Sequence, residues 1–101
     1  MLPETNSVFR LSGEQTVRTI AETHHALVEF YNGAASITID PAPLTDADLT
    51  LIQLIQALRN TAARDGKKIC MTGPLPDVLR DVLVRGGFLN NPDANLFWAA
   101  P

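Results

Sequence analysis

Short β-branched or apolar segments alternate with longer segments of helical periodicity along most of the chain. The sharpest change follows residues 35–39, where an alternating strand pattern stops at two prolines before the helical run of residues 46–63 begins. Such alternation predicts parallel strands joined by right-handed crossover helices. We therefore expect an α/β fold with a mixed, mainly parallel sheet of about 4–5 strands, covered by about 3 helices.

The expected helices and strands follow one another in a regular order. Apolar residues in each helical segment recur at intervals of three and four, and each segment ends near a glycine. The expected strands are residues 8–11, 35–39 and 68–72, the expected helices are residues 16–32, 46–63 and 77–85, and residues 95–99 are expected to pair as a last strand at a sheet edge.

The length of 101 residues, 46% of them hydrophobic, suits one domain with one core. We expect this domain over residues 8–99, with residues 1–7 frayed. The net charge of −3 argues against binding to nucleic acid or to an anionic membrane surface. Because the chain has no apolar run of membrane-spanning length and does not begin with a secretory pattern, a cytoplasmic protein is expected.

The cysteine and the histidines form no set typical of a catalytic centre. Cys70 is the only cysteine and lies in an apolar strand segment, so it is interpreted as a small core residue. His24 and His25 are adjacent on a helix, about 100° apart, and cannot share one metal ion. His24 falls on the apolar stripe at the edge of the core, whereas His25 is expected to face solvent.

Three aspartates leave one enzymatic alternative open. Asp40 is separated from Asp46 and Asp48 by two prolines, and no fourth metal ligand is visible near them. We expect no enzymatic activity, no cofactor and no bound metal. A small acid-catalysed enzyme using these three carboxylates stays as the less favoured class.

The start of the second helical segment carries the most informative polar residues. Thr45 suits a helix N-cap, and Asp48 follows three residues later, close to a capping box. Asp46 and Asp48 would complement the helix dipole, each by about 0.3–1 kcal/mol, which explains both carboxylates without a function. The same residues follow a strand of the expected parallel sheet, at the edge where such sheets bind ligands. The sequence therefore allows either a role in helix capping or a role in docking for Asp46 and Asp48.

Leu49 and Ile52 lie outside the main apolar stripe of this helix, near its glutamines. Burial by neighbouring loops is the favoured explanation. If they are exposed, they form an apolar patch beside Asp46, which is typical of a surface that docks another protein.

The order and spacing of several short motifs resemble the STAS domain, the fold of bacterial anti-sigma factor antagonists. The resemblance runs from a leucine–glycine–acid turn at residues 11–14 to residues 87–89 and covers most of the chain. It also includes Ile39–Asp40, Leu44 to Leu49, Ala57–Leu58–Arg59, Asp65–Gly66, Met71–Thr72–Gly73 and Val78–Leu79–Arg80. The implied fold is a STAS-like sandwich.

In STAS domains this helix start carries an aspartate, two serines, a glycine and a leucine. The subunits that accompany lipid-transporting ABC ATPases carry aspartate, threonine, alanine, glycine and leucine instead. By this resemblance Asp46 stands where the phosphorylated serine or threonine would be, and Asp48 replaces the glycine. The implied partner-binding and regulatory residues are Thr45, Asp46, Asp48, Leu49 and Ile52.

The resemblance implies a bacterial, non-catalytic regulatory module that binds another protein. The expected partner is an anti-sigma factor or an ATPase-fold kinase in a partner-switching or signalling pathway. The alternative is an accessory subunit of a lipid-transport ABC system, whose partner would be the ABC ATPase.

Overall fold

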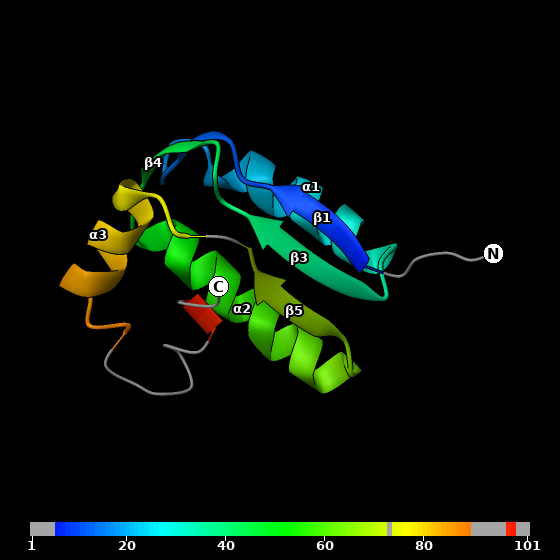
Figure 1. The fold of residues 1–101 in the computed structure, drawn as a ribbon. Coiled ribbons are helices and arrows are strands. Elements are labelled where there is room, and N and C mark those ends of the chain that lie inside the picture. The colour runs from blue at the N-terminus through cyan, green and yellow to red at the C-terminus, as the bar shows by residue number, and fades with distance from the viewer. Residues whose placement is uncertain (1–5, 73, 90–96, 99–101) are drawn as a thin grey trace.

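The computed structural model describes residues 6–72, 74–89 and 97–98, which form a mixed α/β fold (Figure 1). In order, the elements are β1 (Asn6–Arg10), β2 (Gly13–Gln15), α1 (Ile20–Asn32), β3 (Ser36–Asp40), β4 (Leu44–Ala47), α2 (Leu49–Asp65), β5 (Lys68–Met71) and α3 (Asp77–Arg85). Within these ranges, none of the helices has the length and apolar character needed to cross a bilayer.

The main sheet consists of β1, β3 and β5, in that order and all parallel. The chain thus advances across the sheet in one direction, first through α1 and then through α2. Right-handed crossovers that advance in one direction place their helices on the same face of the sheet. Figure 1 shows α1 and α2 together behind this sheet. The expected α/β fold with parallel strands is confirmed, with one layer of crossover helices.

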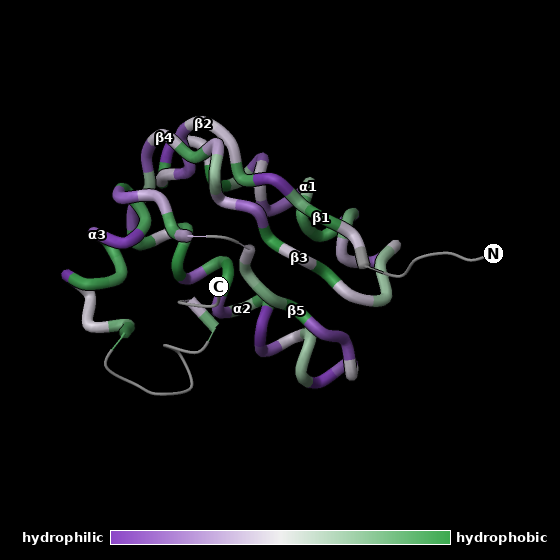
Figure 2. Tube along the Cα trace, in the orientation of Figure 1, coloured by the Kyte–Doolittle hydropathy of each residue, from purple (hydrophilic) through white to green (hydrophobic). Residues whose placement is uncertain are grey.

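The core fills the space between the sheet and these two helices. Ile37 and Ile39 of β3 are buried in one cluster with Leu51 and Ile55 of α2. Figure 2 shows hydrophobic residues recurring along β3 and α2. Because β3 is the central strand and α2 is the longest described helix, their contact forms the middle of the core.

A second sheet pairs β2 with β4, again in parallel. Pro41 is buried after β3, and its carbonyl accepts a hydrogen bond from the Leu44 N–H at 3.0 Å, which turns the chain into β4. Helix α3 contacts β4. Figure 1 shows this small unit beyond the carboxyl ends of the main strands. The sequence pattern predicts neither β2 nor β4, because each is too short to show an alternating period.

Three expectations about the ends and faces of the elements were wrong. Helix α1 begins at Ile20, because the N–H groups of Thr19 and Ile20 both donate to the Thr16 carbonyl in a preceding turn, and Val17 is 70% exposed. Strand β1 begins at Asn6, so part of the segment expected to be frayed is paired. Cys70 is exposed because its side chain alternates away from the helix-covered face.

The expected last strand at residues 95–99 is also wrong for the two of its residues that the structure describes. Phe97 and Trp98 have helical backbone conformation and buried side chains. Their rings pack edge to face at 5.0 Å, and the Arg59 guanidinium lies 4.2 Å from the centre of the Phe97 ring. These contacts fix the aromatic pair against α2 and in the core. Residues 95, 96 and 99 lie outside the described part of the chain.

Candidate docking surface at the start of helix α2

Asp46 lies on strand β4 and not in the first turn of a helix. Its side chain is exposed, and one carboxylate oxygen accepts a hydrogen bond from the neighbouring Ala47 N–H at 2.9 Å. In the β2–β4 pairing Asp46 stands opposite Glu14. Like charges opposite each other on paired strands repel, although Arg18 lies 3.6 Å from the Glu14 carboxylate and offsets part of this charge. Asp46 is therefore a solvent-facing negative charge with no capping role.

The N-cap of α2 is Asp48, so the expectation that Thr45 caps this helix was wrong. One Asp48 carboxylate oxygen accepts hydrogen bonds from the Thr50 N–H, at 2.9 Å, and from the Thr50 hydroxyl. The other oxygen accepts from the Val17 N–H, also at 2.9 Å. Thr45 remains exposed on β4. Pairing of residues 44–47 with β2 moves the helix start to Leu49, which leaves Asp48 at the capping position.

These hydrogen bonds shift the protonation equilibrium of Asp48. Partial burial raises the pKa of a carboxyl group, because it disfavours the charged form. The Thr50 hydroxyl and the N–H groups of Val17, Thr50 and Leu51 outweigh this effect and hold the pKa of Asp48 below its ordinary value. Asp48 is thus an ionised structural residue that joins the turn before α1 to the start of α2.

The two apolar residues singled out on α2 have different environments. Ile52 is fully buried in the core, whereas Leu49 is 48% exposed. The favoured explanation was burial by neighbouring loops: Ile52 is indeed buried, as a member of the core cluster, whereas burial is wrong for Leu49. Residues three apart lie only about 60° apart around a helix, so the difference comes from position: Leu49 is the first residue of α2, whereas Ile52 lies one turn further in. Only Leu49 contributes to an exposed surface.

Leu49 lines a shallow groove of about 310 Å³ between the start of α2 and α3. From α3, the groove includes the half-buried Val82 and the exposed Arg85. The lining residues are Ala47, Asp48, Leu49, Val82, Arg85 and Gly86. No local sequence pattern indicates that α3 packs on the unpredicted strand β4, so α3 is not predictable as a wall of this groove.

We define the β4–α2 surface as Thr45, Asp46 and Leu49 together with this groove. It combines an exposed carboxylate, an exposed leucine and an apolar hollow with a cationic residue on its rim. Such a combination of apolar centre and charged rim is typical of surfaces that bind proteins. Of the five predicted site residues, Ile52 contributes to the core, and Asp48 stabilises the helix start while also lining the groove.

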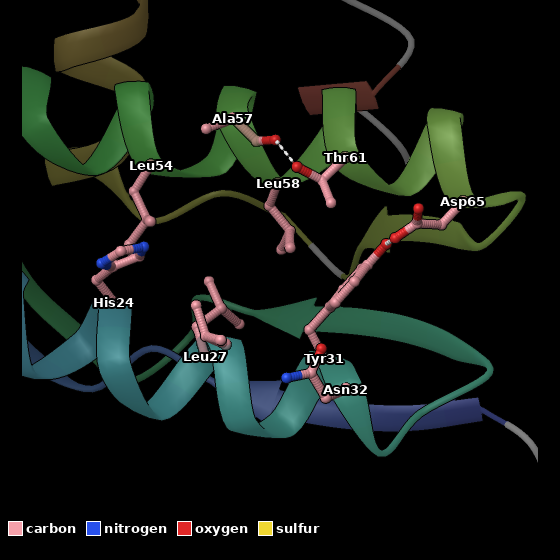
Figure 3. Close-up of a pocket in the computed structure, with 10 residues that line it drawn as sticks. His24, Leu27, Tyr31, Asn32, Leu54, Ala57, Leu58, Thr61 and Asp65 are labelled. Atoms are coloured by element: carbon pink, nitrogen blue, oxygen red, sulfur yellow. Dashed lines mark hydrogen bonds between the residues drawn. The ribbon is translucent and has the colours of Figure 1, made fainter.

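A second groove, of about 240 Å³, lies between α1 and α2 (Figure 3). His24 is exposed and lines it beside Leu54, as Figure 3 shows. At the other end the Tyr31 hydroxyl donates to the Asp65 carboxylate at 2.7 Å. Burial, this hydrogen bond and the negative charge of Asp65 raise the pKa of Tyr31. His25 points elsewhere and lies 3.3 Å from the Glu29 carboxylate.

Asp40 belongs to a structural network and not to an acidic cluster with Asp46 and Asp48. Its carboxylate lies 3.6 Å from the Arg10 guanidinium and accepts hydrogen bonds from the Ala42 N–H and the Thr72 hydroxyl, at 3.0 and 3.4 Å. It thereby joins the ends of β1, β3 and β5. Over residues 6–72, 74–89 and 97–98, no group of three or more histidine, cysteine or acidic side chains is placed to hold a metal ion.

Comparison with protein-family models, with curated proteins and with solved structures gave no match to this chain.

Proposed function

We propose that this chain is a non-catalytic regulatory module that binds a partner protein through the β4–α2 surface. The single observation that supports this most is the 48% exposure of Leu49 at the edge of the apolar groove. A leucine at the first position of a helix is readily buried by a neighbouring loop, yet here it stays open beside Asp46. On binding, Leu49 and the groove would supply buried apolar area, and the charge of Asp46 would favour partners with complementary charge.

The STAS resemblance leads us to propose an anti-sigma factor or an ATPase-fold kinase as the partner, in a bacterial partner-switching or signalling pathway. Asp46 occupies the position that is phosphorylated in such domains. A carboxylate has a negative charge and acceptor oxygens but carries about half the charge of a phosphate group. We propose that Asp46 holds the module in a state that partly resembles the phosphorylated one. The ABC ATPase of a lipid-transport system is the alternative partner.

The test is a binding titration with a candidate from either partner class, chosen from the proteins encoded beside this one in its own genome. We expect Leu49→Asp to weaken binding to the true partner by at least about tenfold, because it places an unpaired charge in an apolar contact. Val28→Asp on α1 is the matched control, since Val28 is 44% exposed and lies away from β4. Equal affinities for wild type, Leu49→Asp and Val28→Asp would place the interface elsewhere.

The charge at position 46 gives an independent readout. In the STAS domains that this chain resembles, negative charge here opposes binding to the anti-sigma target. Asp46→Ser is therefore expected to tighten such a complex. Asp46→Lys, which reverses the charge, is expected to change the affinity by more than Asp46→Ser does. Glu29→Ser removes an exposed carboxylate near the C-terminal end of α1, away from the turn that Asp48 holds, and is expected to leave affinity unchanged. Indifference of the complex to both Asp46 variants would contradict the proposed regulatory role.

A further inference from the structure

Strand β5 is an edge of the main sheet, because within the described residues it pairs with β3 alone. The Thr72 N–H donates to the Ile39 carbonyl at 2.9 Å, so the backbone of Thr72 points toward β3. Backbone direction alternates along a parallel strand, which places the N–H and C=O groups of Cys70 on the same side. The N–H and C=O groups of Ile69 and Met71 therefore point away from the sheet. These are the groups to which a further strand would pair.

A groove of about 400 Å³ lies between this edge and α2. Figure 1 shows β5 at the lower side of the main sheet. The lining residues of the groove are Gln56, Arg59, Asn60, Ala63, Lys67, Ile69 and Phe97. Two of them are cationic and none is acidic. The groove also differs from the β4–α2 surface in location, because it flanks the middle and end of α2.

Neither cation in this groove has a carboxylate within 4.0 Å among the described residues. The Arg59 guanidinium lies over the Phe97 ring and donates to the Gln56 side chain at 3.2 Å. Lys67 donates to the Tyr31 carbonyl at 2.7 Å, and its ammonium group lies 4.0 Å from the centre of the Tyr31 ring. Both side chains are thus held in place by aromatic and neutral groups, while their charges are left for an anionic ligand.

The unpaired β5 edge lies directly beside the cationic groove, so a strand added at this edge would place side chains in the groove. Side chains of an added strand alternate between the two faces of the sheet. Every second side chain would therefore project to the helix-covered face, where the Ile69 side chain lines the groove. We propose that the β5 edge binds an extended, acidic peptide segment of a partner protein as an additional strand, with carboxylates of that segment placed near Arg59 and Lys67. This mode combines main-chain hydrogen bonds with side-chain pockets.

Charge favours this occupant over a second copy of the chain. Pairing of two β5 edges would bring two cationic grooves toward each other, together with the exposed Lys68 of each copy. Like charges at that distance oppose association. An acidic strand at β5 would pair with the outward N–H and C=O groups of Ile69 and Met71 and would also place negative charge near Arg59 and Lys67.

The first test is binding of a short fluorescent peptide of alternating glutamate and valine, with a lysine–valine peptide of equal length as the control ligand. We expect binding of the acidic peptide only, and a loss of at least about tenfold with Arg59→Glu. Arg64→Glu is the matched control, since Arg64 is exposed on the same helix and does not line the groove. Arg59→Gln, which keeps a long side chain, is expected to give a smaller loss. Equal binding of both peptides, or equal losses with Arg59→Glu and Arg64→Glu, would overturn the proposal.

The second test does not depend on any substitution. Amide hydrogen exchange measured by NMR is expected to be fast at Ile69 and Met71 in the free protein and to slow by at least about tenfold when the acidic peptide is bound. The Cys70 amide, which points to β3, is the internal control and is expected to be protected in both states. Protection of Ile69 and Met71 in the free protein would show that this edge is already paired. If the peptide instead slowed amide exchange in β1, it would bind the opposite edge of the sheet. Either of these two results would refute the proposal.

Discussion

The Asp48 carboxylate accepts a hydrogen bond from the Val17 N–H at 2.9 Å, across 31 positions of the chain. The same side chain caps α2 through Thr50. One ionised group therefore fixes two structural features at once: the first turn of α2 and the position of the turn that leads into α1. Asp46, two residues earlier, makes no comparable long-range contact among the described residues. The two carboxylates, similar in the sequence, have separate structural and surface roles.

Substitution of Asp48 is expected to destabilise the protein, and substitution of Asp46 is not. Asp48→Ala removes the N-cap and leaves the Val17 N–H without its acceptor, so the free energy of unfolding should fall by about 1–2 kcal/mol. Asp46→Ala removes an exposed side chain and should change it by less than about 0.5 kcal/mol. Asp48→Asn keeps one acceptor oxygen for the cap, so its loss in free energy of unfolding should lie between those of Asp46→Ala and Asp48→Ala. Urea denaturation measures all three; a larger loss for Asp46→Ala than for Asp48→Ala would contradict the assignment.

The lowered pKa of Asp48 predicts how stability depends on acid. In the folded protein this carboxyl group stays ionised at lower pH than in the unfolded chain, so the unfolded chain binds the proton first as pH falls. Its contribution to stability is complete above the unfolded pKa of about 3.9 and is lost as pH falls through the folded pKa. The stability difference between wild type and Asp48→Asn should therefore shrink from about pH 6 to about pH 3. A constant difference over this range would show that the charge of Asp48 does not matter.

Two glycines at helix ends should respond oppositely to alanine. Gly66, the C-cap of α2, has a φ of 75°, and this left-handed conformation is unfavourable for a residue with a side chain. Gly66→Ala should lower the free energy of unfolding by about 1 kcal/mol. Gly33, the C-cap of α1, has a φ of −94° and room for an added Cβ atom, so Gly33→Ala should be neutral or stabilising by up to about 1 kcal/mol. Thermal unfolding followed by circular dichroism distinguishes these outcomes.

The only tyrosine of the chain gives a direct optical test of the contact between α1 and α2. Burial and the Asp65 carboxylate raise the pKa of Tyr31 above 10.0, so an absorbance titration should show ionisation at higher pH than for free tyrosine. Asp65→Asn removes the negative charge and should lower the midpoint. Because the folded pKa is raised, the contribution of Tyr31 to stability is present below the unfolded pKa and is lost as pH rises through the folded one. A midpoint unchanged by Asp65→Asn would indicate that burial alone causes the shift.

The sequence predicts the main sheet and its helices because each of these elements has a clear apolar period. Residues 46–63 show the stripe that α2 buries, and residues 35–39 show the alternation of β3. The start of α2 is less predictable, since Thr45 and Asp48 are both good capping residues. The choice between them depends on pairing of β4 with β2, a contact about 30 residues away in the sequence that no local pattern shows.

The candidate site is predictable in part for the same reason. The exposed charge of Asp46 follows from its residue type, but the difference between Leu49 and Ile52 depends on the helix start and on the position of α3. A helix that begins at Leu49 places Ile52 against the core and leaves Leu49 at the rim. The cationic groove at β5 was missed altogether, because Phe97 follows Arg59 and Lys67 by at least 30 positions in the sequence and joins them only in the folded protein.

The burial of Trp98 also has a consequence for synthesis of the chain. Trp98 shares one core cluster with Leu11, although all eight helices and strands described here precede it in the sequence. A nascent chain on the ribosome can therefore form β1, α1 and β3 early, but its core stays open until residue 98 has emerged. During that interval Arg59 on α2 lacks its contact with the Phe97 ring, and the core lacks the Trp98 side chain. Chaperone contacts with the growing polypeptide are expected to concentrate there and to end when Phe97 and Trp98 reach their places.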